Sequence, residues 1–203
     1  MALATRLAAL LPLLALAACG QTPAAEALRM ATVPAAPVAE PPAEQGPSLL
    51  LQGPRQVVLV PAAGAGARQV WRGPGNVALA TDGARVVATA GLAQMVMATR
   101  FDGHDPLEDA RALAGREARA RRTVDLAGTD RDAGSMRFGL VLDCTLRGRA
   151  EGGWLVIEER CASDEVASFT NRFWADPATG IVWRSEQWAG DGVAMLSVQL
   201  RGT

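Results

Sequence analysis

Three cysteines carry the clearest chemical signal in this sequence of 203 residues, and Cys19 is the most informative of them. It directly follows a pair of alanines at the end of an apolar stretch, Leu7–Ala18, which begins after the positive charge of Arg6. The stretch is shorter than the roughly 20 apolar residues of a membrane-spanning helix, so it is typical of a secretory signal. A cysteine at this place completes a lipobox, in which the thiol forms a thioether to diacylglycerol. The sequence therefore predicts a lipoprotein signal peptide over residues 1–18 and lipidation of Cys19.

The lipid on Cys19 also predicts where the protein resides. Two or three acyl chains hold a protein stably on a membrane, at about 0.8 kcal/mol per buried CH₂. We expect diacylglycerol and an N-acyl chain such as palmitate at this cysteine, and no cofactor. Gly20 follows the cysteine, whereas enterobacterial lipoproteins retained in the inner membrane carry an aspartate there. By this analogy we expect anchorage in the outer membrane, with the protein facing the periplasm.

The other two cysteines, Cys144 and Cys161, would lie in an exported and oxidising setting, where a disulfide is the default. Both fall on the apolar parity of their predicted strands. A hairpin folded near residues 152 and 153 places them roughly opposite one another. Two cysteines and the single distant histidine, His104, cannot complete a zinc site without carboxylates. We therefore predict a Cys144–Cys161 disulfide and no metal site.

Tryptophans and polar side chains near the end of the chain are candidates for binding. Four of the five tryptophans lie within the last fifty residues. Aromatic rings can stack on the apolar face of pyranose rings, but burial in the core is the alternative. In a straight strand at most one of Trp183 and Trp188 points into the core; core packing is favoured for Trp183, and neither reading is favoured for Trp188. The candidate residues for binding a glycan or a partner are Arg172, Trp183, Arg184, Gln187 and Trp188.

The sequence shows no catalytic motif. A glycosidase needs two carboxylates about 5–10 Å apart across a cleft. Glu158 and Glu159 are neighbours in a predicted strand and face opposite sides, so they cannot form that pair. A serine hydrolase would need a histidine base, but His104 lies in a polar loop and no Gly-x-Ser-x-Gly motif is present. Carboxylates that could still converge are Asp143, Glu158, Glu165 and Glu186.

The charge balance excludes one class of partner. A net charge of −1 argues against nucleic acid, which would require a clear basic excess. An arginine cluster, made up of Arg116, Arg119, Arg121 and Arg122, could attract an acidic polymer. Because acidic residues flank it on both sides, a solvated face is the favoured interpretation.

The pattern of residues predicts a proline-rich tether followed by one domain. Residues 19–48 are rich in alanine, proline and glutamate and lack a periodic apolar face, which is typical of a disordered tether. An N-cap, Asp105, with Pro106 after it predicts a short helix that stops near Gly115. Predicted strands cover residues 57–60, 69–72, 76–81, 84–90, 117–126, 136–146, 154–161, 168–174, 181–188 and 195–201. We therefore predict a mainly β domain over residues 49–203, an antiparallel β-sandwich or partly open barrel with one short helix.

The domain resembles the YjbF or GfcB family of group 4 capsule polysaccharide lipoproteins. The blocks that carry the resemblance are Thr170–Trp174, Gly180–Trp183 and Ser185–Trp188, with Val70–Arg72 and Val86–Leu92 upstream. Ala93 and Gln94 depart from the family, which usually has glycine and an acidic residue there. Glu186 stands where the family has arginine, which weakens the case for an anionic sugar at this position. The resemblance implies a mainly β domain and a role in exopolysaccharide production or export, beside an outer-membrane β-barrel protein from the same gene cluster.

These observations together predict a lipid-anchored accessory protein of exopolysaccharide or capsule production or export. It would act by binding an outer-membrane partner, the polysaccharide, or both, without catalysis. The alternative is a small glycan-modifying hydrolase that uses carboxylates of the C-terminal strands, and a third interpretation is an envelope lipoprotein with no glycan contact. A deep cleft with two converging carboxylates would favour the enzyme, whereas a flat aromatic or apolar patch would favour a binding protein.

Overall fold

The computed structural model describes residues 47–52, 56–130, 133–191 and 194–202. The predicted signal peptide, the lipidated Cys19 and all but the end of the predicted tether lie outside these residues, so those predictions stand untested. Among the described residues, no helix is long and apolar enough to cross a membrane.

Alternation of apolar and polar residues produces twelve strands in the described part of the chain. The strands are β1 (Ser48–Gln52), β2 (Gln56–Ala65), β3 (Arg68–Arg72), β4 (Ala78–Asp82), β5 (Arg85–Ala90), β6 (Gln94–Phe101), β7 (Glu117–Gly128), β8 (Arg137–Glu151), β9 (Trp154–Ala162), β10 (Phe169–Ala175), β11 (Val182–Gln187) and β12 (Leu196–Arg201). Two 3₁₀ helices accompany them, η1 (Pro106–Leu113) and η2 (Ala133–Ser135).

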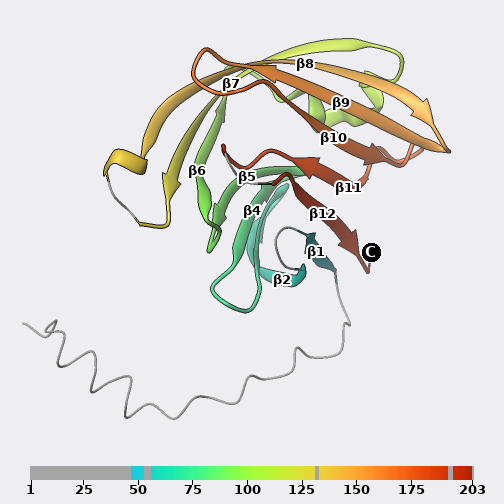
Figure 1. Ribbon diagram of the computed structural model, residues 1–203. Helices are drawn as coiled ribbons and strands as arrows, with labels where there is room; N and C mark the ends of the chain where they lie inside the picture. Colours follow the sequence, from blue (N-terminus) through green and yellow to red (C-terminus); the bar gives the residue numbers. More distant parts are fainter. Residues whose placement is uncertain (1–46, 53–55, 131–132, 192–193, 203) are drawn as a thin grey trace, which may run out of the picture. The chain divides into compact units, whose positions relative to one another are not determined.

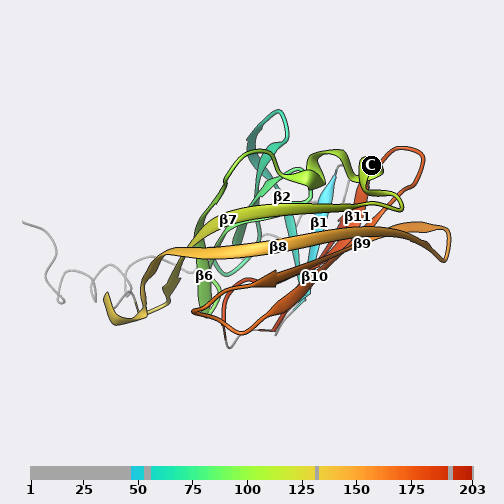
Figure 2. The same ribbon diagram turned by 90° about the horizontal axis from the view of Figure 1, so that it is seen from above.

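The twelve strands form one sheet in the order β5-β4-β3-β2-β1-β12-β11-β10-β9-β8-β7-β6, and each strand runs antiparallel to its neighbours. The two end strands, β5 and β6, are neighbours in sequence, and the Val96 amide donates to Thr89 Oγ1 across them at 2.9 Å. The sheet is therefore nearly closed, and the long strands β7 to β10 arch over β11 and β12 (Figure 1; Figure 2 from above). The mainly β prediction is confirmed, with the partly open barrel as the better of the two architectures.

The core fills the inside of this curved sheet in two clusters. The larger one gathers leucines and valines around Trp71, with Leu59, Leu140 and Leu142 fully buried. In the smaller cluster η1 lays Leu107 against the inner face of β8, β9 and β10. The residues of these three strands in the smaller cluster are Leu146, Leu155, Ile157, Phe173 and Ala175.

The predicted short helix begins where expected but is a 3₁₀ helix. Asp105 caps it by accepting a hydrogen bond from the Leu107 amide at 3.0 Å, with Pro106 in the first turn. Asp109 has non-helical backbone angles and divides the element into two short turns. Gly115, with a positive φ of 66°, follows its end.

The β8–β9 hairpin holds the disulfide and is longer than predicted. Cys144 and Cys161 are directly opposed in register and are joined by a disulfide bond. The hairpin folds at residues 152 and 153 as expected, but the strand predicted over residues 136–146 is too short: β8 continues to Glu151, and Gly152 and Gly153 alone make the turn, with φ of 58° and 85°. Two residues with positive φ are typical of a tight hairpin turn, and glycine adopts them without steric cost.

Candidate functional site

A buried arginine, Arg85, joins three parts of the fold. It is the first residue of β5, directly after the tight β4–β5 turn, and its side chain is 1% exposed. Its Nε and Nη2 atoms donate to the two carboxylate oxygens of Asp105 at 2.8 and 2.9 Å. Its Nη1 atom donates to Glu159 Oε2 at 2.6 Å. The guanidinium lies 5.2 Å from the ring centroids of both Phe101 and Phe173, so cation–π contacts add to the ion pairs.

The carboxylate of Glu159 extends this network to two more strands. Asn171 Nδ2 on β10 donates to Glu159 Oε2 at 2.5 Å, and Asn171 Oδ1 accepts from the Trp188 amide at 2.7 Å. Arg122 on β7 places Nη2 3.7 Å from Glu159 Oε2. Within the described residues, Glu159 Oε1 and Arg122 Nε are buried and have no hydrogen-bond partner. A buried ionic network therefore connects β5, β7, β9, β10 and the cap of η1.

The pKa values in the network reflect a competition between burial and charge. Burial alone would raise the pKa of Glu159, but attraction by Arg85 and Arg122 outweighs it and lowers the pKa to about 2. Burial lowers the pKa of Arg122 to about 10, and repulsion by Arg85 adds to this against the attraction of Glu159. For Arg85 the two carboxylates overcome burial and the pKa is raised. All three side chains are therefore charged at neutral pH.

We expect the network to make stability depend on acid pH. The pKa of Glu159 is lower in the folded state than its ordinary value of 4.5, so the contribution of this carboxylate to stability is fully present above about pH 4.5 and is lost as pH falls toward 2. In urea unfolding, the free-energy difference between wild type and Glu159→Gln should be largest above pH 5 and shrink steadily below pH 4. Glu165→Gln, an exposed acid beyond β9, is the control and should show little change. A wild-type advantage that stays constant from pH 7 to pH 2.5 would contradict the ionised Glu159.

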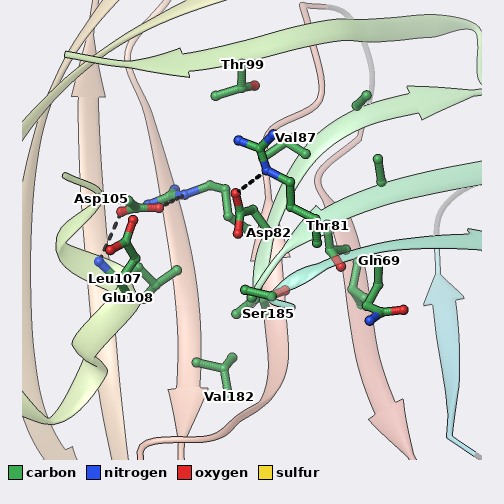
Figure 3. A pocket seen from close by; sticks show the side chains of 18 of the residues that line it. Gln69, Thr81, Asp82, Val87, Thr99, Asp105, Leu107, Glu108, Val182 and Ser185 are labelled. Atoms are coloured by element: carbon green, nitrogen blue, oxygen red, sulfur yellow. Dashed lines mark hydrogen bonds and ion pairs between the residues drawn. The ribbon is translucent and has the colours of Figure 1, made fainter. Parts of the chain in front are cut away.

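A hollow of about 1430 Å³ lies beside Arg85, bounded by β3, β4, β5, β6, η1 and β11. Much of its wall is alanine and glycine, and these small side chains leave the space open. Figure 3 shows Asp105 and Glu108 on one side of the hollow and Gln69 and Thr81 on another, with Ser185 between them. The volume exceeds the roughly 300–1,000 Å³ of a typical small-molecule site.

Two of the predicted binding residues, Gln187 and Trp188, are used inside the protein. Gln187 is buried; its Nε2 donates to Ala84 O at 2.8 Å and to Ser185 Oγ at 2.9 Å, and its Oε1 accepts from the Val86 amide at 3.0 Å. It therefore fastens β11 to the start of β5. Trp188 is half-buried and stacks on Phe169 with ring centroids 4.5 Å apart.

Trp183 lies where β11 departs from the expected straight strand. The β10–β11 register shifts between Trp174 and Ala175, and Trp183 has no partner in the pairing, so simple alternation does not apply to it. Its ring is 5.0 Å from the ring of Trp154 and it lines the hollow. Its indole Nε1 is buried and has no hydrogen-bond partner among the described residues.

Arg172 and Arg184 lie on the outer face of the sheet, opposite to Phe173 and Glu159. Arg184 pairs with Glu186 at 2.7 Å, lies 4.7 Å from the Trp174 ring, and also lines the hollow. Arg172 contacts Glu158 on β9 at 3.3 Å. The five predicted residues therefore divide among the outer face of the sheet, the hollow and the interior, and they do not form one site.

Three arginines on the outer face share one carboxylate, and we call them the Glu158 arginine cluster. Arg149, Arg160 and Arg172 place guanidinium nitrogens 3.1, 3.7 and 3.3 Å from Glu158. Burial tends to raise the pKa of Glu158, but the arginines outweigh it and lower the pKa. Although Arg149 also pairs with Glu151, the cluster retains more positive than negative charge and is at least half exposed.

Several important residues were not predicted as site residues. The sequence identifies Asp105 only as a helix N-cap and Asn171 only as part of the block Thr170–Trp174, and it links neither of them to Arg85, because the contacting residues are distant in the chain. The interpretation of Arg116–Arg122 as a solvated face is wrong for Arg122, which is buried, although the other arginines are exposed. Arg122 lies two residues before Val124 and four before Leu126 on β7, so all three side chains point to the same face. This shared parity with two apolar residues is the signal that could have placed Arg122 inside.

Comparison with known proteins gives two findings. A family model described as group 4 capsule polysaccharide lipoprotein gfcB, YjbF, matches residues 32–200. The crystal structure of the hypothetical lipoprotein YmcC from Escherichia coli (K12) superposes with a TM-score of 0.69. That match has 21% sequence identity and covers 90% of this chain and 98% of YmcC, so it supports the fold. No curated protein matches the sequence.

Proposed function

Because this chain belongs to the YjbF family of group 4 capsule polysaccharide lipoproteins, we propose that it is an accessory protein of exopolysaccharide or capsule production or export. In this proposal the lipid on Cys19 anchors it in the outer membrane, and the domain faces the periplasm. It acts by binding a polysaccharide, an outer-membrane β-barrel protein of the same secretion machinery, or both.

The Glu158 arginine cluster is the observation that best supports glycan binding. Three guanidinium groups around one carboxylate leave an excess of positive charge on an outward surface. Trp174 follows Arg172 by two residues on β10 and therefore lies on the same outer face, with the Arg184 guanidinium over its ring. Guanidinium groups bind carboxylates and phosphates through paired hydrogen bonds, and aromatic rings stack on sugars, so this surface suits an acidic glycan.

The carboxylates around the hollow favour binding over hydrolysis. Asp105 accepts two hydrogen bonds from Arg85, and Asp82 pairs with Arg68 at 2.9 Å. Both acids are thus engaged within the protein, and among the described acids of the lining this leaves Glu108 alone without an arginine, whereas a glycosidase needs a pair of carboxylates. On the outer face, Glu158 and Glu186 are likewise held by arginines. The geometry therefore gives no specific support to the alternative of a glycan-modifying hydrolase.

The proposal is tested by recovering the lipidated protein from native envelope and identifying what comes with it. We expect an acidic glycan, an outer-membrane barrel protein, or both in the eluate. The double variant Arg160→Gln/Arg172→Gln should recover several-fold less glycan, and higher salt should weaken wild-type recovery in the same way.

A matched control separates the cluster from net charge. Arg72→Gln/Arg116→Gln removes two exposed arginines away from the cluster, one at the end of β3 and one directly before β7, and should leave glycan recovery unchanged. Equal losses from the two double variants would show a non-specific charge effect. Recovery of neither glycan nor barrel protein, from cells that are producing exopolysaccharide, would contradict the proposed function.

A further inference from the structure

The hollow beside Arg85 retains hydrogen-bonding capacity that the protein itself does not use. Trp183 Nε1 is a buried donor without a partner among the described residues. The hydroxyl oxygens of Thr81 and Ser185, both buried, accept from Trp71 Nε1 at 3.1 Å and from Gln187 Nε2 at 2.9 Å. Among the described residues neither hydroxyl donates a hydrogen bond, so each hydroxyl hydrogen remains able to donate, and all three residues line the hollow.

The charged groups around the hollow are, by contrast, already paired. Arg85 is bound to Asp105 as described above. The other three arginines of the lining pair with acids: Arg68 with Asp82 at 2.9 Å, Arg100 with Asp125 at 2.9 Å, and Arg184 with Glu186 at 2.7 Å. Each of these guanidinium groups therefore already lies beside a carboxylate, so the hollow offers an anionic ligand little uncompensated positive charge.

The remaining acid of the lining also disfavours an anion. Among the described residues that line the hollow, Glu108 has no arginine partner, and its nearest base is the exposed His104 at 4.0 Å. Figure 3 shows Glu108 beside Asp105 on the η1 side. Its negative charge repels acidic groups from the hollow.

We propose that the hollow binds an uncharged sugar segment of a glycan. Indole and hydroxyl donors pair with sugar oxygens, the Gln69 amide oxygen can accept from sugar hydroxyls, and the alanine- and glycine-rich wall admits the rings. At about 1430 Å³ the hollow has room for more than one ring. This assignment rests on the proposed function only in taking the ligand to be a glycan, since its site and its ligand chemistry differ from those of the Glu158 arginine cluster.

The test is calorimetric titration of the full lipidated protein, held in a detergent without a sugar headgroup. The probes are neutral oligosaccharides of glucose, galactose and mannose, up to six residues long, and oligogalacturonates of equal length. We expect a neutral oligomer to bind. Trp183→Phe should weaken that binding about five- to tenfold, because one hydrogen bond of roughly 1 kcal/mol is lost. Ala98→Leu, which adds volume within the hollow, should weaken it further.

Trp154→Phe is the matched control, because it makes the same substitution in the ring that contacts Trp183 but lies outside the lining. It should change the affinity less than twofold. Trp183→Phe removes no hydrogen bond that is found among the described residues, so it should remain folded, and thermal unfolding of both tryptophan variants checks this.

Three results would overturn the assignment: no neutral oligomer bound at 10 mM, equal effects of the two tryptophan variants, or oligogalacturonate binding that Ala98→Leu blocks. If the recovery of acidic glycan still depends on Arg160 and Arg172 while no neutral oligomer binds, only the assignment of the hollow fails. If a neutral oligomer binds in the hollow but the protein recovers no glycan from the native envelope, the result would instead count against the proposed function alone.

Discussion

Replacing Arg85 with methionine is expected to destabilise the protein by about 3–5 kcal/mol, the largest effect of any single substitution considered. The change removes the guanidinium that Asp105 and Glu159 share, and it leaves the fully buried Glu159 with the weaker contacts of Arg122 at 3.7 Å and Asn171. Methionine keeps much of the apolar contact with Phe101 and Phe173, so the loss reports mainly on charge. Urea unfolding of the full chain at pH 7, followed by circular dichroism, measures the difference.

The exposed pair of Arg68 and Asp82 provides the control for this experiment. Both side chains are more than a third exposed, so Arg68→Met should cost less than about 1 kcal/mol. If Arg85→Met also cost less than 1 kcal/mol, the buried network would not hold the fold together. A cycle with Glu159→Gln sharpens the result: removing both charges should cost less than the sum of the single losses, because neither partner is then left alone.

The network explains how the open side of the sheet is held. β5 and β6 end the sheet and no strand pairing joins them, although the Val96–Thr89 hydrogen bond connects them at one point. Arg85 fixes the start of β5 to η1 and β9, and Gln187 fixes the same segment to β11 through the Val86 amide and the Ala84 carbonyl. These contacts place the β4–β5 turn beside the hollow. The polar core therefore determines the shape of the proposed sugar site.

Local patterns predicted the strands more successfully than the site. The strand predicted over residues 136–146 and the break predicted between the strands at 76–81 and 84–90 each depend on residues close in sequence, and both were found. Phe138 has the same strand parity as the buried Leu140 and Leu142 but is 71% exposed, because Gly139 adopts a φ of 75° and interrupts the alternation. β6 was not predicted as a strand. It begins at Gln94, one of the two residues that depart from the family pattern.

The site depends on contacts that no local pattern encodes. Arg85 and Glu159 are 74 residues apart, and only the closure of the sheet brings them together. The two faces of a strand did follow from the sequence: Glu158 and Glu159 point to opposite sides, as adjacent residues in a strand must. What alternation could not indicate is that the inward glutamate would meet two arginines and that the outward one would meet three.

Removing the disulfide is expected to have the second-largest effect, a loss of about 2–4 kcal/mol. Cys144 and Cys161 are separated by 17 residues, and a closed loop of about 15 residues restricts the unfolded chain by roughly 3 kcal/mol. The bond lies in the core beside the ionic network, with Arg122 Nη2 4.0 Å from Cys161 Sγ. Its loss should therefore lower the stability of the β8–β9 hairpin that carries both Glu158 and Glu159.

The measurement compares urea unfolding of wild type and Cys144→Ala/Cys161→Ala, each with and without a thiol reductant. Wild type should lose stability on reduction and approach the double variant, whereas the double variant should not respond. A wild type that is insensitive to reductant even when unfolded would contradict the bond. Because the disulfide and Arg85 both restrain the inner face of the β8–β9 hairpin, combining Arg85→Met with the double alanine variant should leave little folded protein at 25 °C, and the proposed glycan surface and the hollow should then be lost together.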